Sequence, residues 1–288
     1  MHSSILYNGR IMAASDRLLS PGQIGLLSGW GVFSTIRVAS GVLFAWERHW
    51  ARMKHDAELL RVPFPEDSEK VRGLLIELVR ANHVSSATLR VVVVRNRGGI
   101  WEGPGLDRDY DLIALTTQPK DWGEGARLAV IPQARHSACM FAGTKSLSWS
   151  MNLCWHEMAK AKGYDEALLL NEHDNVSECT SANVFVAHGG RVMTPPLSSG
   201  CLPGITREVL LNDIHVPGVV FEERDLQLAD LEEADEIFIT STTRDLLPVL
   251  SVEGLRLRGQ DEVRPALNRA FANYIECYAA ENKEKECT

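Results

Sequence analysis

The chain has 288 residues, enough for two compact cores, and its 45% hydrophobic and 24% charged residues are typical of a soluble globular protein. Its 38 acidic and 30 basic side chains give a formal net charge of -8, and no basic run offsets it, which argues against a nucleic-acid-binding protein. No apolar stretch approaches the roughly 20 residues that span a bilayer. The first residues lack the apolar core of a signal peptide, and the six cysteines form no CxxC pair. We therefore expect a cytoplasmic protein with reduced cysteines.

The first half of the chain predicts a set of strands and two helices. Asn8-Gly9 is a hairpin signal, and a Gly-rich stretch over 22–31 leads into an apolar run. From Trp46 the apolar residues recur at helical spacing, and a second amphipathic helix follows around 71–78. Linker-like composition at 119–126 predicts a domain boundary there. Strands are expected over 4–7, 32–38, 42–44, 89–94 and 112–117.

The second half alternates short strands with helices. A helix over about 149–162 ends at Gly163, another covers 205–212, and the last begins near Pro265. This alternation predicts an α/β (α+β) fold with two domains and a cleft between them. Strands are expected over 128–131, 167–170, 184–187, 192–194, 219–221 and 237–240. The expected division is a first domain over 1–118, a linker over 119–126 and a second domain over 127–288.

Four separated segments carry the residues that suggest chemistry. In chain order they are Thr144-Lys145-Ser146-Leu147, Val176-Ser177-Glu178-Cys179, Leu202-Pro203-Gly204-Ile205-Thr206-Arg207 and Thr240-Ser241-Thr242-Thr243-Arg244. Together they resemble the class IV (fold type IV) aminotransferase family, which uses pyridoxal 5′-phosphate (PLP) and includes branched-chain and D-amino-acid aminotransferases and aminodeoxychorismate lyases. The resemblance runs from Asn8-Gly9 to the final helix. It implies a PLP enzyme with the cofactor in the cleft between two α/β domains, and a homodimer or higher homo-oligomer.

The resemblance assigns the chemical roles. Lys145 matches the lysine whose amine holds the cofactor and moves a proton during turnover. Glu178 matches the carboxylate that faces the pyridine nitrogen. Arg52, in His49-Trp50-Ala51-Arg52-Met53, matches the phosphate arginine of a His-x-x-Arg-Leu element, where a planar guanidinium can donate twice to one phosphate.

The remaining phosphate contacts are expected at two further places. Ile205 and Thr206 lie in the first turn of a predicted helix, where backbone N–H groups and the helix dipole favour an anion. Thr242 matches another phosphate donor of the family. Asn183 matches a family asparagine that we expect to be a structural hydrogen-bonding residue. No metal site is expected, because no His or Cys cluster has metal spacing.

The residues that would select the substrate resemble three subfamilies. Arg90 lies where branched-chain enzymes hold a substrate-carboxylate arginine, although Thr88 replaces their nearby tyrosine. Lys145-Ser146-Leu147 looks more like the D-amino-acid enzymes, whereas Ser177-Glu178-Cys179-Thr180 is similar to the lyases. Further substrate candidates are Phe33 and Thr243, and an apolar pocket is expected from Trp30, Phe33, Trp149 and Trp155.

The first functional hypothesis is therefore amino transfer between a branched-chain L-amino acid and 2-oxoglutarate. A 4-amino-4-deoxychorismate lyase is the second hypothesis and a D-amino-acid transaminase the third. A non-enzymatic binding module stays open as well, but a binding module needs no lysine to hold a cofactor covalently. Small-molecule amino acids and 2-oxo acids, rather than nucleic acids or membranes, are the expected partners.

Overall fold

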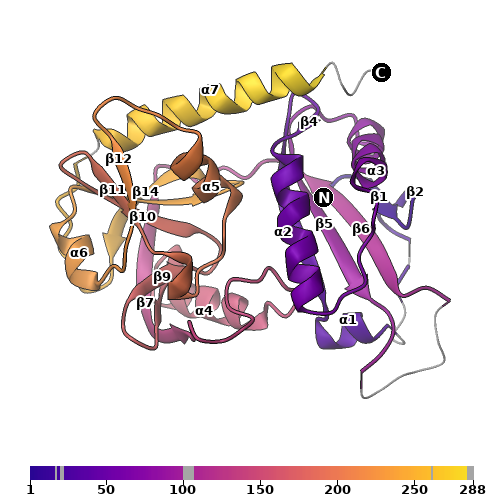
Figure 1. Cartoon of the computed structure of the whole chain (residues 1–288), viewed down its shortest axis with the longest axis horizontal. Coiled ribbons are helices and arrows are strands. Elements are labelled where there is room, and N and C mark those ends of the chain that lie inside the picture. Colours follow the sequence, from indigo (N-terminus) through magenta and orange to yellow (C-terminus); the bar gives the residue numbers. More distant parts are fainter. Residues whose placement is uncertain (17, 20–22, 100–106, 261, 284–288) are drawn as a thin grey trace. The chain divides into compact units, whose positions relative to one another are not determined.

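The computed structural model describes residues 1–16, 18–19, 23–99, 107–260 and 262–283 (Figure 1). These residues divide into two compact units, which are described one after the other. The first unit comprises Met1–Lys120, Lys145–Trp149 and Ile275–Thr288, and the second comprises Asp121–Thr144 and Ser150–Tyr274. Gly22, the start of the expected Gly-rich stretch, lies outside the described residues.

The first unit is built on an antiparallel sheet with the strand order β2-β1-β6-β5-β3-β4. The strands are β1 (Ser4–Tyr7), β2 (Arg10–Ala13), β3 (Gly31–Ala39), β4 (Val42–Leu43), β5 (Ala87–Arg95) and β6 (Tyr110–Thr117). Its helices are α1 (Ile24–Ser28), α2 (Trp46–Leu59) and α3 (Ser68–Ala81). The expected hairpin is present, because Asn8 and Gly9 both have positive φ between β1 and β2.

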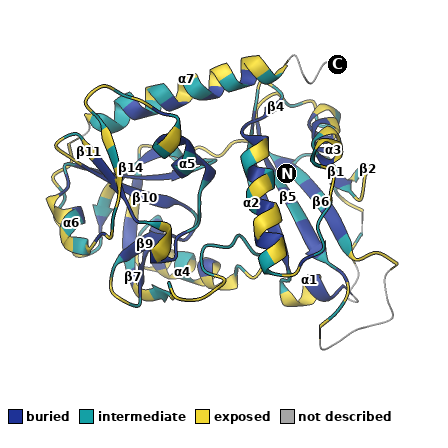
Figure 2. Ribbon diagram, in the orientation of Figure 1, coloured by how far each residue is buried: buried dark blue, intermediate teal, exposed yellow. Residues whose placement is uncertain are grey.

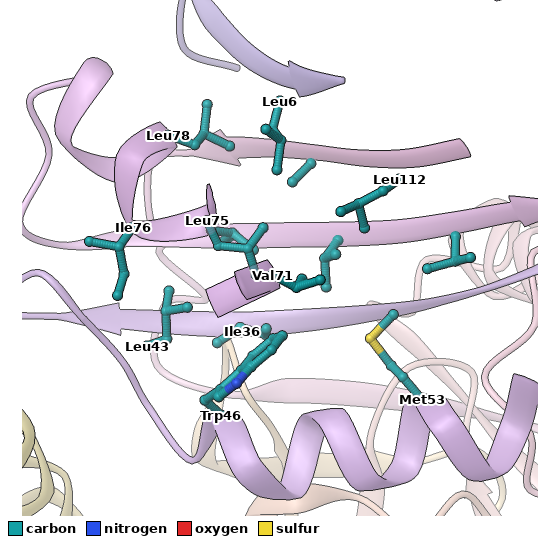
Figure 3. Packing of buried hydrophobic residues seen from close by; sticks show 14 of the residues in the cluster. Leu6, Ile36, Leu43, Trp46, Met53, Val71, Leu75, Ile76, Leu78 and Leu112 are labelled. Carbon is teal, nitrogen blue, oxygen red and sulfur yellow. The ribbon is translucent and has the colours of Figure 1, made fainter. Parts of the chain in front are cut away.

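Helices α2 and α3 bury their apolar faces in one core with the sheet. Trp46 and Met53 of α2 and Val71 and Leu75 of α3 lie in the same buried cluster as strand residues such as Ile36 (Figure 3). Buried and exposed residues alternate along α2 at helical spacing (Figure 2). This packing fixes the side of α2 that faces the sheet.

The second unit contains a sheet with the strand order β12-β11-β10-β13-β14-β7-β8-β9. The pairs β11 with β12, β14 with β7 and β7 with β8 are parallel, and the others are antiparallel. The strands are β7 (Ala126–Arg135), β8 (Glu166–Asn171), β9 (Val176–Cys179), β10 (Asn183–His188), β11 (Arg191–Thr194), β12 (Val220–Glu223), β13 (Glu236–Ser241) and β14 (Asp245–Val252).

The second unit also contains helices. They are α4 (Ser150–Ala161), a 3-10 turn (Leu197–Ser199), α5 (Ile205–Asn212) and α6 (Leu228–Glu233), followed by α7 (Val263–Lys283), whose residues up to Tyr274 belong to this unit. Of these helices, α4, α5 and α6 contact strands of the second sheet. Ala159 of α4 packs on Ala129 of β7 and Leu169 of β8. Gly163 has φ 84°, as expected of a residue that follows a helix end.

The predicted α/β architecture is confirmed, and most predicted elements are present within a few residues. The structure adds α1 inside the Gly-rich stretch and α6, and it extends the strand expected over 128–131 to Ala126–Arg135. Strands β9 and β14 were not predicted as strands. None of the described helices is long and apolar enough to cross a membrane.

Candidate active site

Lys145 is held by backbone contacts to the first unit. Its backbone N–H donates to the buried Asp56 carboxylate of α2 (3.0 Å), and its carbonyl accepts from the Phe33 N–H of β3 (3.1 Å). The side-chain Nζ lies 4.7 Å from the centroid of the Phe33 ring and 5.9 Å from that of Trp149. The Lys145 amine therefore lies near two aromatic rings, and the Lys145 backbone is hydrogen-bonded to both helix α2 and strand β3.

Arg52 lies on α2 and is hydrogen-bonded to the same strand. Its Nη2 donates to Ser34 Oγ (3.0 Å), and Ser34 Oγ also lies 2.7 Å from His49 Nδ1. Burial, together with the positive charges of Arg52 and Lys145, holds the pKa of the His49 imidazole well below its usual range. Arg52 and Lys145 therefore both lie close enough to the buried His49 imidazole to lower its pKa.

Arg90 on β5 shares the aromatic ring of Phe33 with Lys145. Its guanidinium carbon lies 4.0 Å from the ring centroid, and partial burial lowers its pKa. Among the described residues it has no hydrogen bond or ion pair with another side chain or backbone group. The first unit therefore brings together four of the predicted site residues: Lys145, Arg52, Arg90 and Phe33.

Glu178 lies on β9 of the second unit, and both of its carboxylate oxygens are fixed. Arg135 forms an ion pair with Oε1 (2.9 Å), and the Leu202 backbone N–H donates to Oε2 (3.1 Å). Arg135 also donates to Asn152 Oδ1 (3.3 Å), and Asn152 donates to the Thr180 carbonyl (2.6 Å). The carboxylate is thus held in one orientation by residues of a second strand, a helix and a loop.

The turn that enters α5 approaches Asn183 closely. Asn183 Nδ2 donates to the Leu202 carbonyl (2.8 Å), in agreement with the expected structural role. A Cβ on Gly204 would overlap Asn183 Oδ1, so a larger residue there would displace the Asn183 side chain from the Leu202 carbonyl. The first intrahelical bond runs from the Glu208 N–H to the Gly204 carbonyl, so the backbone N–H groups of Ile205 and Thr206 precede the helical ladder.

Thr242 and Thr243 form the turn between β13 and β14. The Arg244 N–H closes this turn on the Ser241 carbonyl (3.2 Å), and the Trp122 indole donates to the Thr243 carbonyl (2.8 Å). Ser241 Oγ lies 3.4 Å from Thr243 Oγ1. The second unit therefore carries Glu178, Ile205, Thr206, Thr242 and Thr243.

A buried ion pair anchors this turn. Arg244 Nη2 donates to Glu166 Oε2 (2.8 Å) and to Ser181 Oγ (3.0 Å), and its guanidinium lies 3.8 Å from the Trp122 ring centroid. Burial by itself would raise the pKa of Glu166, but His156, Arg244 and Thr180 hold it at about 2. Glu166 and Arg244 are 1% and 4% exposed, so water does not screen the pair.

The expected aromatic pocket is only partly assembled within either unit. Phe33 and Trp149 meet edge to face in the first unit, with ring centroids 6.1 Å apart. Trp30 instead lies against Arg95 and donates to the Leu60 carbonyl, and Trp155 lies against Arg135 in the second unit. Phe33 and Trp149 therefore both lie beside the Lys145 amine.

Sequence reasoning assigned no role to four residues that support the site: Arg135, Asn152, Glu166 and Arg244, the last of which ends the fourth segment. Each is polar, yet each is largely buried in a hydrogen-bond network. A charged residue directly before the apolar run 167–170 was a visible signal for Glu166. No local signal marks its pairing with Arg244, which lies 78 residues away.

These side chains fit PLP. A dianionic phosphate calls for cations and backbone donors, and Arg52 and the start of α5 are of those kinds. His49 Nε2 is buried without a hydrogen-bond partner among the described residues, as a polar atom beside a missing polar group would be. A pyridine nitrogen calls for a fixed carboxylate, and Glu178 is one.

Comparison with known proteins gives the same family. The family model for amino-transferase class IV matches residues 31–252. A protein of Methanocaldococcus jannaschii, provisionally named a branched-chain-amino-acid aminotransferase, is 32% identical over 87% of this chain and 88% of its own length. The D-alanine aminotransferase of Bacillus licheniformis is 30% identical, with the same two shares covered.

The fold agrees as well. The crystal structure of the branched-chain amino acid aminotransferase of Escherichia coli superimposes with a TM-score of 0.88 at 24% identity, covering 96% of this chain and 95% of the other. The matched region of the family model, 31–252, spans every predicted site residue. The chain therefore belongs to the class IV aminotransferases, a family of enzymes that use pyridoxal 5′-phosphate.

Proposed function

We propose that this enzyme transfers the amino group of a branched-chain L-amino acid to 2-oxoglutarate. The observation that carries the proposal is the surroundings of Phe33 in the first unit. The Arg90 guanidinium lies 4.0 Å from its ring centroid without a polar partner among the described residues, and the Lys145 amine lies 4.7 Å from it. A cation for an α-carboxylate, an amine and an apolar surface are what an aliphatic amino acid requires.

Each predicted residue is proposed to have one task. When bound, PLP supplies an electron sink for the amino acid's α-carbon. Lys145 would hold the cofactor covalently at rest, and once the substrate amine has taken its place, its freed Nζ would move the proton between the amino acid's α-carbon and the cofactor's C4′ carbon. Glu178 keeps a proton on the pyridine nitrogen, and Arg135 fixes the orientation of that carboxylate.

The other residues are proposed to bind rather than to react. Phosphate donors are Arg52, Thr242 and the backbone N–H groups of Ile205 and Thr206. Arg90 binds the substrate carboxylate, Phe33 supplies apolar contact for the aliphatic side chain, and Thr243 adds a polar contact. The 26–32% identity to relatives named for branched-chain substrates supports this substrate class.

Three further properties belong to this proposal. We expect the interdomain linker at 119–126, a cytoplasmic location, and assembly into a homodimer. The homodimer is supported by apolar side chains on α4 that face solvent, namely Met151 (62% exposed), Leu153 (51%) and Met158 (51%). Apolar side chains gathered on one short helix are a common feature of subunit interfaces.

A substrate panel tests the function. Purified enzyme saturated with PLP is assayed with L- and D-amino acids against 2-oxoglutarate, and separately for pyruvate release from aminodeoxychorismate. We expect L-leucine, L-isoleucine and L-valine to be the best donors and to differ modestly, because one methylene is worth roughly 1–3 kcal/mol in such a pocket. Faster turnover of D-alanine or D-glutamate, or dominant pyruvate release, would replace the proposed substrate. The Lys145→Ala variant, which should be inactive in every assay, is the control for contaminating enzymes.

A further inference from the structure

Two buried polar side chains, Ser34 and His49, and the half-buried Arg52 form a continuous chain of hydrogen bonds in the first unit. Arg52 and His49 lie on α2 three residues apart, and therefore on the same side of the helix. Ser34, on β3, lies between them: its Oγ is 3.0 Å from Arg52 Nη2 and 2.7 Å from His49 Nδ1. Ser34 and His49 are both 0% exposed.

The direction of these hydrogen bonds follows from the chemistry of the groups. A guanidinium has only donors, so Ser34 Oγ must accept from Arg52. The hydroxyl proton of Ser34 is then available to His49 Nδ1, which accepts when the neutral ring carries its proton on Nε2. Burial and the charges of Arg52 and Lys145 lower the pKa of His49 and so favour that neutral ring.

The chain of hydrogen bonds restricts the orientation of the Arg52 guanidinium. An arginine side chain loses rotamer entropy when it is held in one conformation. Because the guanidinium is planar and rigid, a hydrogen bond at Nη2 orients the whole fork of donors. A hydroxyl polarised by a neutral imidazole is also a stronger acceptor than an isolated hydroxyl.

We propose that Ser34 and His49 are positioning residues for the cofactor phosphate: they hold the Arg52 guanidinium in the orientation in which it receives the phosphate. This inference rests on the proposed role of Arg52. Neither Ser34 nor His49 needs to touch the phosphate, and both act through the arginine. Removal of either side chain should therefore weaken the binding of the phosphate group and leave the binding of the ring unchanged.

The test compares the dissociation constants of PLP and of pyridoxal, which lacks the phosphate, for the apo-enzyme. We expect Ser34→Ala and His49→Leu to weaken PLP binding by about tenfold, the scale of one hydrogen bond to a charged group, and to leave pyridoxal binding within about twofold. His49→Asn keeps an acceptor near the Nδ1 position and should restore most of the PLP affinity. Thr116→Val is the matched control, because Thr116 Oγ1 is also fully buried and lies 2.7 Å from a histidine, His2 Nδ1, in the same unit. It should leave both affinities unchanged.

A double-mutant cycle separates the positioning role from the role of Arg52 itself. Arg52→Ala should weaken PLP binding, and Ser34→Ala added to it should cause no further loss. If Arg52→Ala leaves PLP affinity unchanged, the proposed phosphate role of Arg52 is wrong, and the inference is wrong with it. If Arg52→Ala weakens PLP binding but a folded Ser34→Ala does not, the positioning role alone is wrong. Equal losses for PLP and pyridoxal in Ser34→Ala would also overturn it, because they would indicate a general effect on folding.

Discussion

Replacement of Arg244 by methionine should destabilise the second unit and loosen the turn that contains Thr242. The change keeps much of the side chain's length but removes the positive charge that is paired with Glu166 at 2.8 Å. It also removes the hydrogen bonds that Arg244 donates to Ser181. Glu166, 1% exposed, would then be a buried carboxylate that has lost its arginine and keeps His156 and Thr180 beside it.

The magnitude follows from the pKa of Glu166. The folded protein holds it at about 2 instead of 4.5, a shift of about 2.5 units, which corresponds to about 3 kcal/mol of stability at neutral pH. Because the pKa is depressed, this stability is present above pH 4.5 and is lost as the pH falls towards 2. Because His156 and Thr180 share in this shift, we expect Arg244→Met to lower the free energy of unfolding by at most about 3 kcal/mol at pH 7, and to reduce its pH dependence between pH 4.5 and 2 without abolishing it.

Urea denaturation followed by circular dichroism measures this loss, and Arg127→Met is the matched control. Arg127 pairs with Asp165, the residue before Glu166, at 2.9 Å, and the pKa of Asp165 is likewise about 2. Because that pair is largely exposed, water and salt screen it, and its loss should be much smaller. Equal stability of Arg244→Met and wild type, or equal losses in the two variants, would refute the reasoning. Arg244→Met should also bind PLP more weakly than Arg127→Met.

The remaining predictions concern turnover at saturating PLP. Glu178→Gln should lower kcat by more than tenfold, because a neutral amide stabilises a protonated pyridine nitrogen poorly; activity within about twofold of wild type would assign the nitrogen to another residue. Arg135→Met should lower kcat in the same direction by a smaller factor, since the Leu202 N–H remains on the carboxylate, and an unchanged kcat would contradict the positioning of Glu178. Arg90→Ala should raise KM about 10- to 150-fold for both the amino acid and the 2-oxo acid, and an increase for only one of them would argue against a shared carboxylate site.

Local sequence patterns predicted the elements that have strong periodicity or clear end signals. The helical spacing from Trp46 onwards predicted α2, and Pro203-Gly204 before an amphipathic run predicted α5 at residues 205–212. Helix α1 was missed because its five residues lie in a glycine-rich stretch, where helix propensity is low. Strand β9 is four residues long and buried throughout, so it lacks the alternation that marks a half-buried strand.

In the candidate site, too, residues in local motifs could be expected from the sequence, whereas contacts between residues far apart in the chain could not. Lys145, Glu178 and Arg52 were expected as site residues because each lies in a motif whose neighbours resemble those of a known family, and their roles stay predictions. The residues that hold them could not be expected, because their partners are distant in the chain: Arg135 pairs with Glu178 across 43 positions. His49 belongs to the face of α2 that the apolar residues define, yet its burial depends on Ser34 of another element.

The identity of the lysine that holds the cofactor is the most direct test of the account. The enzyme loaded with PLP is reduced with borohydride, digested and examined by mass spectrometry, in parallel with Lys145→Ala and with Lys162→Ala, a surface lysine paired with Glu253. We predict that the pyridoxyl label lies on the peptide containing Lys145 in wild type and in Lys162→Ala, and that it is missing in Lys145→Ala. A label on any other lysine of the wild-type enzyme, or a label retained in Lys145→Ala, would contradict the central claim.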